Sequence, residues 1–348
     1  MCPIIVVDPK ARMRQTLPRE LAFQAADFAI RKGFKEIEVA GGEATVVDYF
    51  WELLDKLCSG DAEVRLVTNG LLTKDEHIQT FLRYPNLQVQ VSIDGTEKIH
   101  DEIRGAKRSF ARAADTLERL VAAGCKRVSI NTVVQRSNYM DMLNVYERFK
   151  HLPYLYHAFS IVEEKEAPDE TIPLEKLDEA FGILRSIQSR ARKDGKDVIL
   201  SDDLLDAYYF RMRYPHYMMH PGMGCTVVQR QVVVMNDGKV VPCYHKLWDE
   251  SDHRRNLHHR TMDEILEDPE ILKEMQEAIG PEGCLGCSTM CYNWDSEFRR
   301  KVMHPDGIAK AQRMLLRSKE YLRENHPRAF RVAKRVKDSL QGAAGLTR

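Results

Sequence analysis

Short apolar strands and amphipathic helices alternate along the first 165 residues, and this alternation constrains the fold more than any other feature. The strand pattern covers residues 36–40, 64–67, 87–93, 127–134 and 154–162. Helical periodicity covers residues 46–58, 74–83, 110–123 and 139–150 between them, and an earlier helix ends near Lys32, before Gly33. Strands separated by helices in this way imply parallel βα units, whose ligands lie at the carboxyl ends of the strands.

Glycine-rich or polar segments stand where three of these strands end. They are Gly41-Gly42-Glu43, Thr68-Asn69-Gly70 and Ser92-Ile93-Asp94-Gly95. Two glycines after a strand let a backbone approach a ligand closely, and a serine at a strand end can hydrogen-bond one. The agreement between pattern and position predicts a ligand site at this edge of the sheet. The second segment has a simpler interpretation as a strand-end turn.

Five of the eight cysteines lie close together in the C-terminal half, at Cys225, Cys243, Cys284, Cys287 and Cys291. In a large chain without an export signal, this grouping favours metal binding over disulfides. A β-hairpin turning at Asn236-Asp237-Gly238 would carry Cys225 and Cys243 on its two arms. Spacing alone leaves both an iron–sulfur cluster and a structural zinc site open. Cys58 and Cys125 stand alone in apolar or helical stretches and are expected to be small buried hydrophobes.

The bulk composition excludes some classes of function. The 52 basic and 52 acidic residues balance, so charge favours neither a nucleic acid nor an anionic membrane surface as partner. No apolar run approaches the length of a transmembrane helix, and the first residues lack the order of a signal peptide. We therefore expect a cytoplasmic protein.

Several motifs stand in a fixed order along the first half of the chain. They are Met1-Cys2-Pro3, Ala40-Gly41-Gly42-Glu43-Ala44-Thr45, Thr68-Asn69-Gly70, Ser92-Ile93-Asp94-Gly95 and His100-Asp101-Glu102-Ile103-Arg104-Gly105. In that order and at that spacing the chain resembles the radical S-adenosylmethionine (radical SAM) enzymes. The resemblance implies that Cys2 is the last cysteine of the family's CxxxCxxC loop, which holds a [4Fe–4S] cluster. The chain would then begin inside that loop and lack its first two cysteines, so we expect it to be inactive as it stands.

The resemblance also implies residues that bind S-adenosylmethionine (AdoMet). Gly41, Gly42 and Glu43 match the motif that contacts the amino group of its methionine moiety. The family usually has proline in place of Ala44, so some rigidity is lost here but not the contact surface.

Further AdoMet contacts are implied by the run SIDGxxxxHDxxRG. Ser92 is implied to bind ribose or carboxylate, and Arg104 to clamp the AdoMet carboxylate. Asn131, on the next strand, is expected to face the adenosine. The other polar residues of the run, Asp94, His100 and Asp101, are expected to shape the turn and cap the helix.

A second resemblance covers residues 222–296. Cys225, the Gly238-to-Cys243 spacing, Arg255-Asn256-Leu257 and the Cys284-to-Cys287 pair resemble the SPASM/twitch module that follows the barrel in many radical SAM enzymes. The pattern departs from a full SPASM module because no cysteine follows Cys291. One auxiliary [4Fe–4S] cluster is implied, with Cys225, Cys243, Cys284 and Cys287 as ligands and Cys291 as a substitute.

Together these features predict an α/β protein in four parts. Residues 1–200 form a partial (β/α)6 TIM-like barrel that lacks its first strand, because five strands are visible and the Cys2 loop needs another before it. A helical connector follows over 201–221, then a small Cys-rich α+β module over 222–296 and a helical extension over 297–348.

The implied function is generation of a 5′-deoxyadenosyl radical that abstracts hydrogen from a substrate. A peptide or protein is the substrate class that the SPASM resemblance favours, and a ferredoxin or flavodoxin is the implied electron donor. The alternative is a catalytically inactive barrel with a structural zinc or iron–sulfur site that serves as a binding module.

Overall fold

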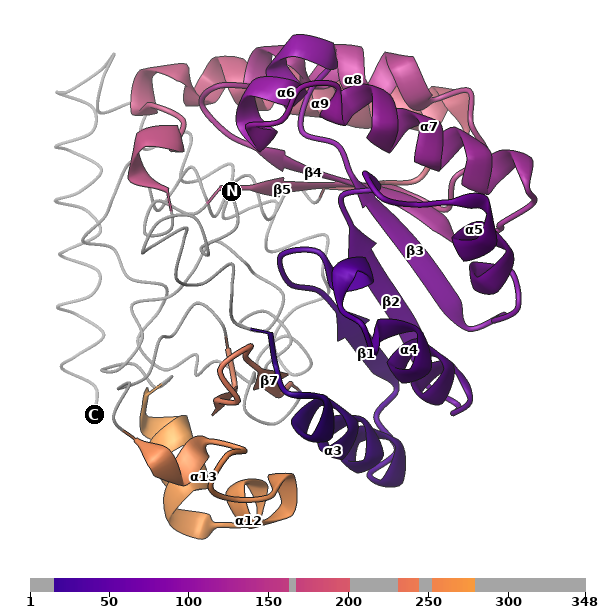
Figure 1. Ribbon diagram of the computed structural model, residues 1–348. Coiled ribbons are helices and arrows are strands. Elements are labelled where there is room, and N and C mark those ends of the chain that lie inside the picture. The colour runs from indigo at the N-terminus through magenta and orange to yellow at the C-terminus, as the bar shows by residue number, and fades with distance from the viewer. Residues whose placement is uncertain (1–15, 163–166, 201–230, 244–251, 279–348) are drawn as a thin grey trace, which may run out of the picture. The chain divides into compact units, whose positions relative to one another are not determined.

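The computed structural model describes residues 16–162, 167–200, 231–243 and 252–278 (Figure 1). The chain divides into two compact units, Met1–Met290 and Cys291–Arg348, and every described residue belongs to the first. The predicted connector (201–221) and C-terminal extension (297–348) lie outside the described residues.

A parallel sheet of six strands forms the larger part of the described chain. Its strands run β1 Glu36–Val39, β2 Glu63–Thr68, β3 Leu87–Ser92, β4 Val128–Val134, β5 His157–Ile161 and β6 Val198–Ile199. Each strand pairs in parallel with the next in sequence, in the order β1-β2-β3-β4-β5-β6. This topology is that of a partial TIM-like barrel, as the sequence predicts.

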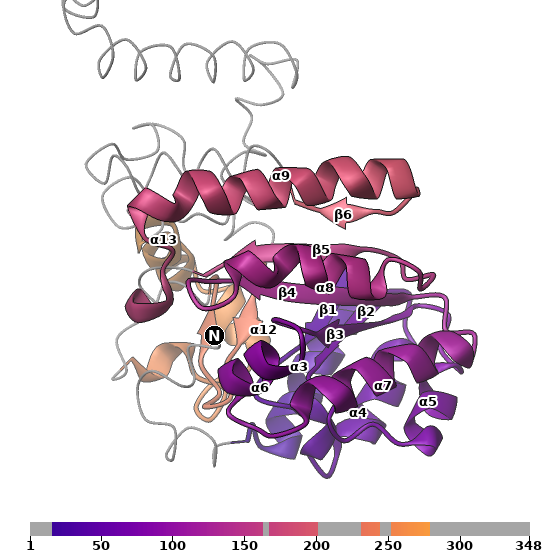
Figure 2. The same ribbon diagram turned by 90° about the horizontal axis from the view of Figure 1, so that it is seen from above.

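Helices connect the strands and cover one face of the sheet (Figure 2). They are α4 Phe50–Cys58, α5 Asp75–Phe81, α6 Glu97–Arg104, α7 Ser109–Ala122, α8 Met142–Phe149 and α9 Leu177–Asp194, while α3 Arg19–Arg31 precedes β1. In α7, Phe110, Ala113, Leu117 and Leu120 recur at helical spacing and are buried. This apolar stripe turns one face of the helix toward the sheet.

The sixth described strand, β6, is absent from the sequence prediction, which counted five strands and took residues 163–200 as helical. β6 has two residues, and they pair with His157 and Ala158 of β5. Two residues are too few to show a period, so no local pattern marks this strand. The predicted helix over 174–193 is confirmed as α9, which ends at Gly195 with φ +65°.

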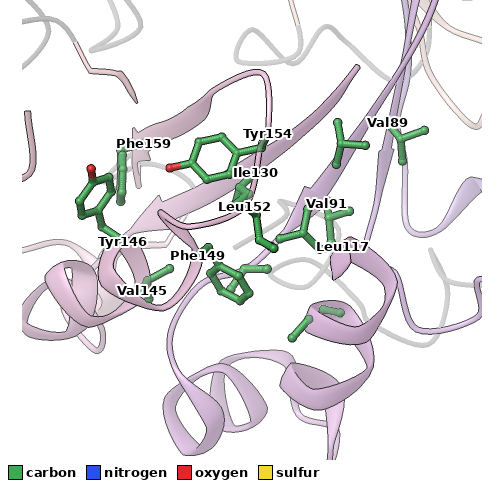
Figure 3. Close-up of a cluster of buried hydrophobic side chains, with 14 of the residues drawn as sticks. Val89, Val91, Leu117, Ile130, Val145, Tyr146, Phe149, Leu152, Tyr154 and Phe159 are labelled. Carbon is green, nitrogen blue, oxygen red and sulfur yellow. The ribbon is translucent and has the colours of Figure 1, made fainter. Parts of the chain in front are cut away.

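The main core lies between the sheet and these helices. Val89 and Val91 of β3 and Ile130 of β4 are fully buried, and they meet Leu117 of α7 and Phe149 of α8 (Figure 3). Each apolar side chain removed from water here contributes about 1.5–3 kcal/mol.

Successive side chains of a strand point to opposite faces of the sheet. The face turned away from the helices carries polar side chains. Gln88 Nε2 donates to Ser129 Oγ at 2.7 Å and to the Tyr156 hydroxyl at 2.5 Å. Arg65 Nε lies 3.0 Å from Glu38 Oε2 on the neighbouring strand. In a barrel this face lines the interior, so Arg65, Gln88 and Ser129 place polar groups in the lumen.

A smaller module follows the barrel. The hairpin β7 Val233–Val234 and β8 Val240–Val241 is antiparallel, as predicted. Its core also includes residues of the helices α12 Met262–Leu266 and α13 Pro269–Ala278, together with Phe28 of α3. The sequence pattern predicts one helix over 262–278, but the structure has two. Pro269 lacks the N–H that a continuous helix needs, and Asp268 Oδ1 accepts from the Glu270 amide at 3.0 Å to start α13.

None of the described helices is long and apolar enough to cross a membrane.

Candidate functional site

Gly41 and Gly42 follow β1 directly and are exposed. Gly41 has φ +153°, a backbone conformation that residues with a side chain rarely adopt. Among the described residues, no atom lies within 4 Å of the place where a Cβ would stand on either glycine. The peptide groups of these residues are therefore open to a ligand at the carboxyl end of the strand.

Glu43 is held by the end of the neighbouring strand. Its Oε1 accepts from Thr68 Oγ1 at 2.8 Å and from Thr45 Oγ1 at 2.7 Å. Its Oε2 accepts from the Asn69 amide at 2.7 Å. The Thr68-Asn69-Gly70 segment, which the sequence predicts as a turn, thus also donates hydrogen bonds to Glu43, the residue after the two glycines. Sequence reasoning missed this role, because a contact 25 residues away leaves no local signal.

Ser92, the last residue of β3, is the register partner of Asn131, which lies in the middle of β4. Ser92 is buried and Asn131 is partly exposed. Asn131 Oδ1 also accepts from Ser160 Oγ at 3.5 Å, a long contact. The structure therefore brings the two predicted residues together on the polar face of the sheet.

Arg104 is the last residue of α6, and its guanidinium is paired within the protein. Arg104 Nη2 lies 2.6 Å from Asp94 Oδ2, and Asp94 Oδ1 accepts from the Val133 amide at 2.9 Å. The Asp94 side chain is 6% exposed and that of Arg104 is 31% exposed. Through Asp94, Arg104 ties α6 to the end of β3 and to β4, and its predicted contact with the AdoMet carboxylate stays a prediction.

His100 and Asp101 shape the segment between β3 and α7, which confirms their expected roles. His100 Nδ1 accepts from the Asp94 amide at 3.0 Å, and burial lowers the pKa of this imidazole to about 4. Asp101 accepts from the Phe110 amide and from Ser109 Oγ, both at 2.8 Å, at the start of α7. The bond from the Phe110 amide is the main cause that lowers the pKa of Asp101.

The Asp101 carboxylate also accepts from the Arg108 amide at 2.5 Å. Arg108 has φ +62° and is the one residue other than glycine in the described ranges with a positive φ. The three bonds to Asp101 hold this strained residue at the turn between α6 and α7.

Cys243 is the predicted cluster ligand that the described residues include, and it lies two residues after β8, half-buried. Gly238, five residues earlier, has φ +81°, and a Cβ there would come within 2.9 Å of Asn256 Oδ1. Asn256 Nδ2 donates to the Asp237 carbonyl at 3.1 Å and holds the turn. The Gly238-to-Cys243 spacing thus belongs to a hairpin that requires glycine.

The other predicted metal ligands, Cys2, Cys225, Cys284, Cys287 and Cys291, lie outside the described residues. Within the described ranges, no three His, Cys, Asp or Glu side chains gather as a metal site would require. Cys58 is buried, and burial raises the pKa of its thiol to about 12, while burial also raises the pKa of Cys125. Cys58 is therefore a buried thiol, as expected, whereas Cys125 is only partly buried.

The described residues fit AdoMet by their chemistry. Open peptide groups at Gly41 and Gly42 suit an amino group, and the Ser92 hydroxyl and Asn131 amide suit ribose, carboxylate or adenine. Gly41 and Gly42 follow β1, Ser92 ends β3 and Asn131 lies beside Ser92 on β4, while β2 separates β1 from β3 in the sheet. Cys243, the predicted sulfur ligand among the described residues, stands two residues after β8 in the second module.

Two sequence families match the chain. The radical SAM superfamily matches residues 2–149, and the iron–sulfur cluster-binding domain called SPASM matches residues 225–288. These two domains imply [4Fe–4S] clusters and AdoMet as cofactors.

Similar proteins include two curated relatives. The sporulation killing factor maturation protein SkfB of Bacillus subtilis is 30% identical over 135 residues, which span 38% of this chain and 33% of that protein. The mycofactocin maturase MftC of Mycobacterium ulcerans is 39% identical over 103 residues, which span 29% of this chain and 28% of that protein. The matches thus cover about a third or less of these relatives.

A solved structure has the same fold. Streptococcus suis SuiB bound to S-adenosylmethionine superposes with a TM-score of 0.60 at 14% identity, covering 75% of this chain and 60% of SuiB. SuiB bound to its precursor peptide SuiA gives a TM-score of 0.57 at 14% identity, covering 77% of this chain and 62% of SuiB. The chain therefore shares this fold, and its sequence matches the radical SAM superfamily over residues 2–149 and the SPASM iron–sulfur cluster-binding domain over residues 225–288.

Proposed function

We propose that the protein is a radical SAM enzyme that modifies a peptide. The observation that carries the proposal is the open backbone at Gly41 and Gly42, beside the paired Ser92 and Asn131 at the same edge of the sheet. SkfB is named a maturation protein and MftC a maturase, and SuiB has been solved with a precursor peptide, which supports a peptide as substrate class.

The residues of this chain would bind and orient the cofactor. Gly41 and Gly42 would present peptide groups to the amino group of AdoMet. Ser92 and Asn131 would hydrogen-bond the polar groups of its adenosine or carboxylate, and Arg104, steadied by Asp94, would add a positive charge near the carboxylate. When bound, AdoMet and a reduced cluster supply a 5′-deoxyadenosyl radical that abstracts hydrogen from a substrate.

Cys2 would be a ligand of the radical cluster. Cys243 would hold one auxiliary [4Fe–4S] cluster with Cys225, Cys284 and either Cys287 or Cys291. A ferredoxin or flavodoxin would donate the electron. The polar lumen formed by Gln88, Gln90 and Tyr156 would leave hydrogen-bonding groups beside the substrate rather than an apolar wall.

Reductive cleavage of AdoMet tests the proposal. The protein, expressed from its full natural reading frame and reconstituted anaerobically with iron and sulfide, is mixed with AdoMet, dithionite and a candidate precursor peptide. We expect 5′-deoxyadenosine and a peptide of changed mass. Stoichiometric zinc without iron, and no 5′-deoxyadenosine, would favour an inactive binding module instead.

A further inference from the structure

The Glu43 carboxylate is already engaged by the protein. A carboxylate has about four acceptor sites, and four donors reach this one: the Thr45 amide at 3.4 Å, the Thr45 hydroxyl at 2.7 Å, the Thr68 hydroxyl at 2.8 Å and the Asn69 amide at 2.7 Å. We infer that Glu43 is a positioning residue that fixes the Gly41-Gly42 backbone, and that Thr68 and Asn69 are the residues that orient it. This inference rests on the proposed function, and it replaces the expectation that the Glu43 side chain itself meets the AdoMet amino group.

Thr68 directs its only hydroxyl proton at Glu43. The Thr68 hydroxyl accepts from the Gly70 amide at 3.1 Å and donates to Glu43 Oε1. The side chain is 3% exposed, so water does not compete for this proton. Asn69 is fixed in the same turn, because its Oδ1 accepts from the Leu71 amide at 2.9 Å while its own amide donates to Glu43.

The turn that carries Thr68 and Asn69 is anchored to α7. Thr116 Oγ1 donates to the Gly70 carbonyl at 2.7 Å. Gly70 has φ +73°, and a Cβ on it would come within 3.3 Å of both Ala113 Cα and Thr116 Cβ. The position of Glu43 is therefore set by a rigid connection from α7 through the end of β2.

The glycines have no comparable anchor of their own. Among the described residues, neither Gly41 nor Gly42 makes a backbone–backbone hydrogen bond, and neither has a side chain. Glu43 is the adjacent residue with fixed contacts, so its four bonds limit how far the two peptide groups can move. Pre-ordering of these groups would lower the entropy cost of binding AdoMet.

Four substitutions separate a positioning role of Glu43 from direct contact with AdoMet. Thr68→Val keeps the shape of the side chain and removes the hydroxyl donor, whereas Thr68→Ser keeps the donor. Thr73→Val is the matched control, because Thr73 lies in the same loop and makes no side-chain bond to Glu43 within the described residues. Glu43→Gln removes the charge and keeps the size.

Hydrogen–deuterium exchange on the purified chain tests the positioning without any cofactor. We expect Thr68→Val to speed exchange of the Asn69, Val46 and Val47 amides several-fold, while Thr68→Ser and Thr73→Val match the wild type. Unchanged exchange in Thr68→Val would overturn the inference and leave the proposed function untouched.

AdoMet binding by the reconstituted protein supplies the second readout. We expect Thr68→Val to raise the Kd about tenfold, the scale of one lost hydrogen bond to a charged group, with rescue by Thr68→Ser. A wild-type Kd in Thr68→Val despite faster exchange would overturn the positioning role. A Glu43→Gln protein that loses AdoMet affinity with unchanged exchange would make Glu43 a direct ligand instead. Failure of every variant and of the wild type to bind AdoMet would refute the proposed function rather than the positioning role of Glu43.

Discussion

The ion pair between Arg104 and Asp94 should stabilise the fold as well as serve the site. Substituting Arg104→Met removes the guanidinium and leaves the Asp94 carboxylate, 6% exposed, with the Val133 amide as its donor in the described residues. Removing one partner of a fully buried pair costs about 3–5 kcal/mol. Because the Arg104 side chain is 31% exposed, solvent screens part of this loss, and we expect the free energy of unfolding to fall by about 2 kcal/mol.

Urea unfolding of a double-mutant cycle measures this effect. Asp94→Asn keeps the acceptor for the Val133 amide and removes the charge, so the Arg104→Met and Asp94→Asn effects should overlap by about 1–2 kcal/mol in the double variant. Lys98→Met is the control, because the Lys98–Glu102 pair is 3.6 Å long with side chains 87% and 65% exposed, and its loss should cost less than about 0.5 kcal/mol. Additive effects, or an Arg104→Met protein as stable as Lys98→Met, would refute the reasoning.

Other variants test further parts of the structure. Burial lowers the pKa of His157 to about 3 from an ordinary value of 6.5. The unfolded chain therefore binds more protons than the folded one, and the free energy of unfolding falls as pH drops below about 6.5. In His157→Phe, a plot of unfolding free energy against pH should have a smaller slope between about pH 6.5 and 5. An unchanged slope would place the titration elsewhere. Gly238→Ala should cost about 1–3 kcal/mol of unfolding free energy, because the residue has φ +81° and the new Cβ meets Asn256 and His258. Gly182→Ala in α9, where a Cβ meets nothing within 4 Å, should instead stabilise by about 0.5–1 kcal/mol in the same urea assay, and a loss of stability there would contradict the described helix.

The parts of the fold that rest on local chemistry could be predicted from the sequence. The hairpin follows from Asp237 and Gly238 between apolar residues, and Gly238 indeed has the positive φ that this turn needs. The βα alternation follows from apolar spacing in helices such as α7 and α9. The break between α12 and α13 could also be predicted from the sequence, because Pro269 cannot continue a helix. The prediction of a single helix over 262–278 overlooked this proline.

The parts that rest on distant contacts could not be predicted. The residues around Arg104 do not indicate that its guanidinium pairs with Asp94. An arginine paired with an exposed carboxylate would have the same local sequence pattern. The bonds from Thr68 and Asn69 to Glu43 depend on β1 and β2 being neighbours in one register. Strand β6 depends on the edge of β5 that it meets, because two residues carry no periodic signal. Such features are set by packing of the whole sheet rather than by the segment that shows them.

AdoMet affinity of Gly42→Ala tests the central claim most directly. A Cβ on Gly42 meets no atom within 4 Å, and its φ lies outside the left-handed region, so the substitution should leave the unfolding free energy within about 0.5 kcal/mol of the wild type. If AdoMet lies against this backbone, equilibrium dialysis with the reconstituted protein should give a Kd raised at least about tenfold, while Gly182→Ala binds as the wild type does. A Gly42→Ala protein with the wild-type Kd would contradict the assignment of this strand edge as the AdoMet site.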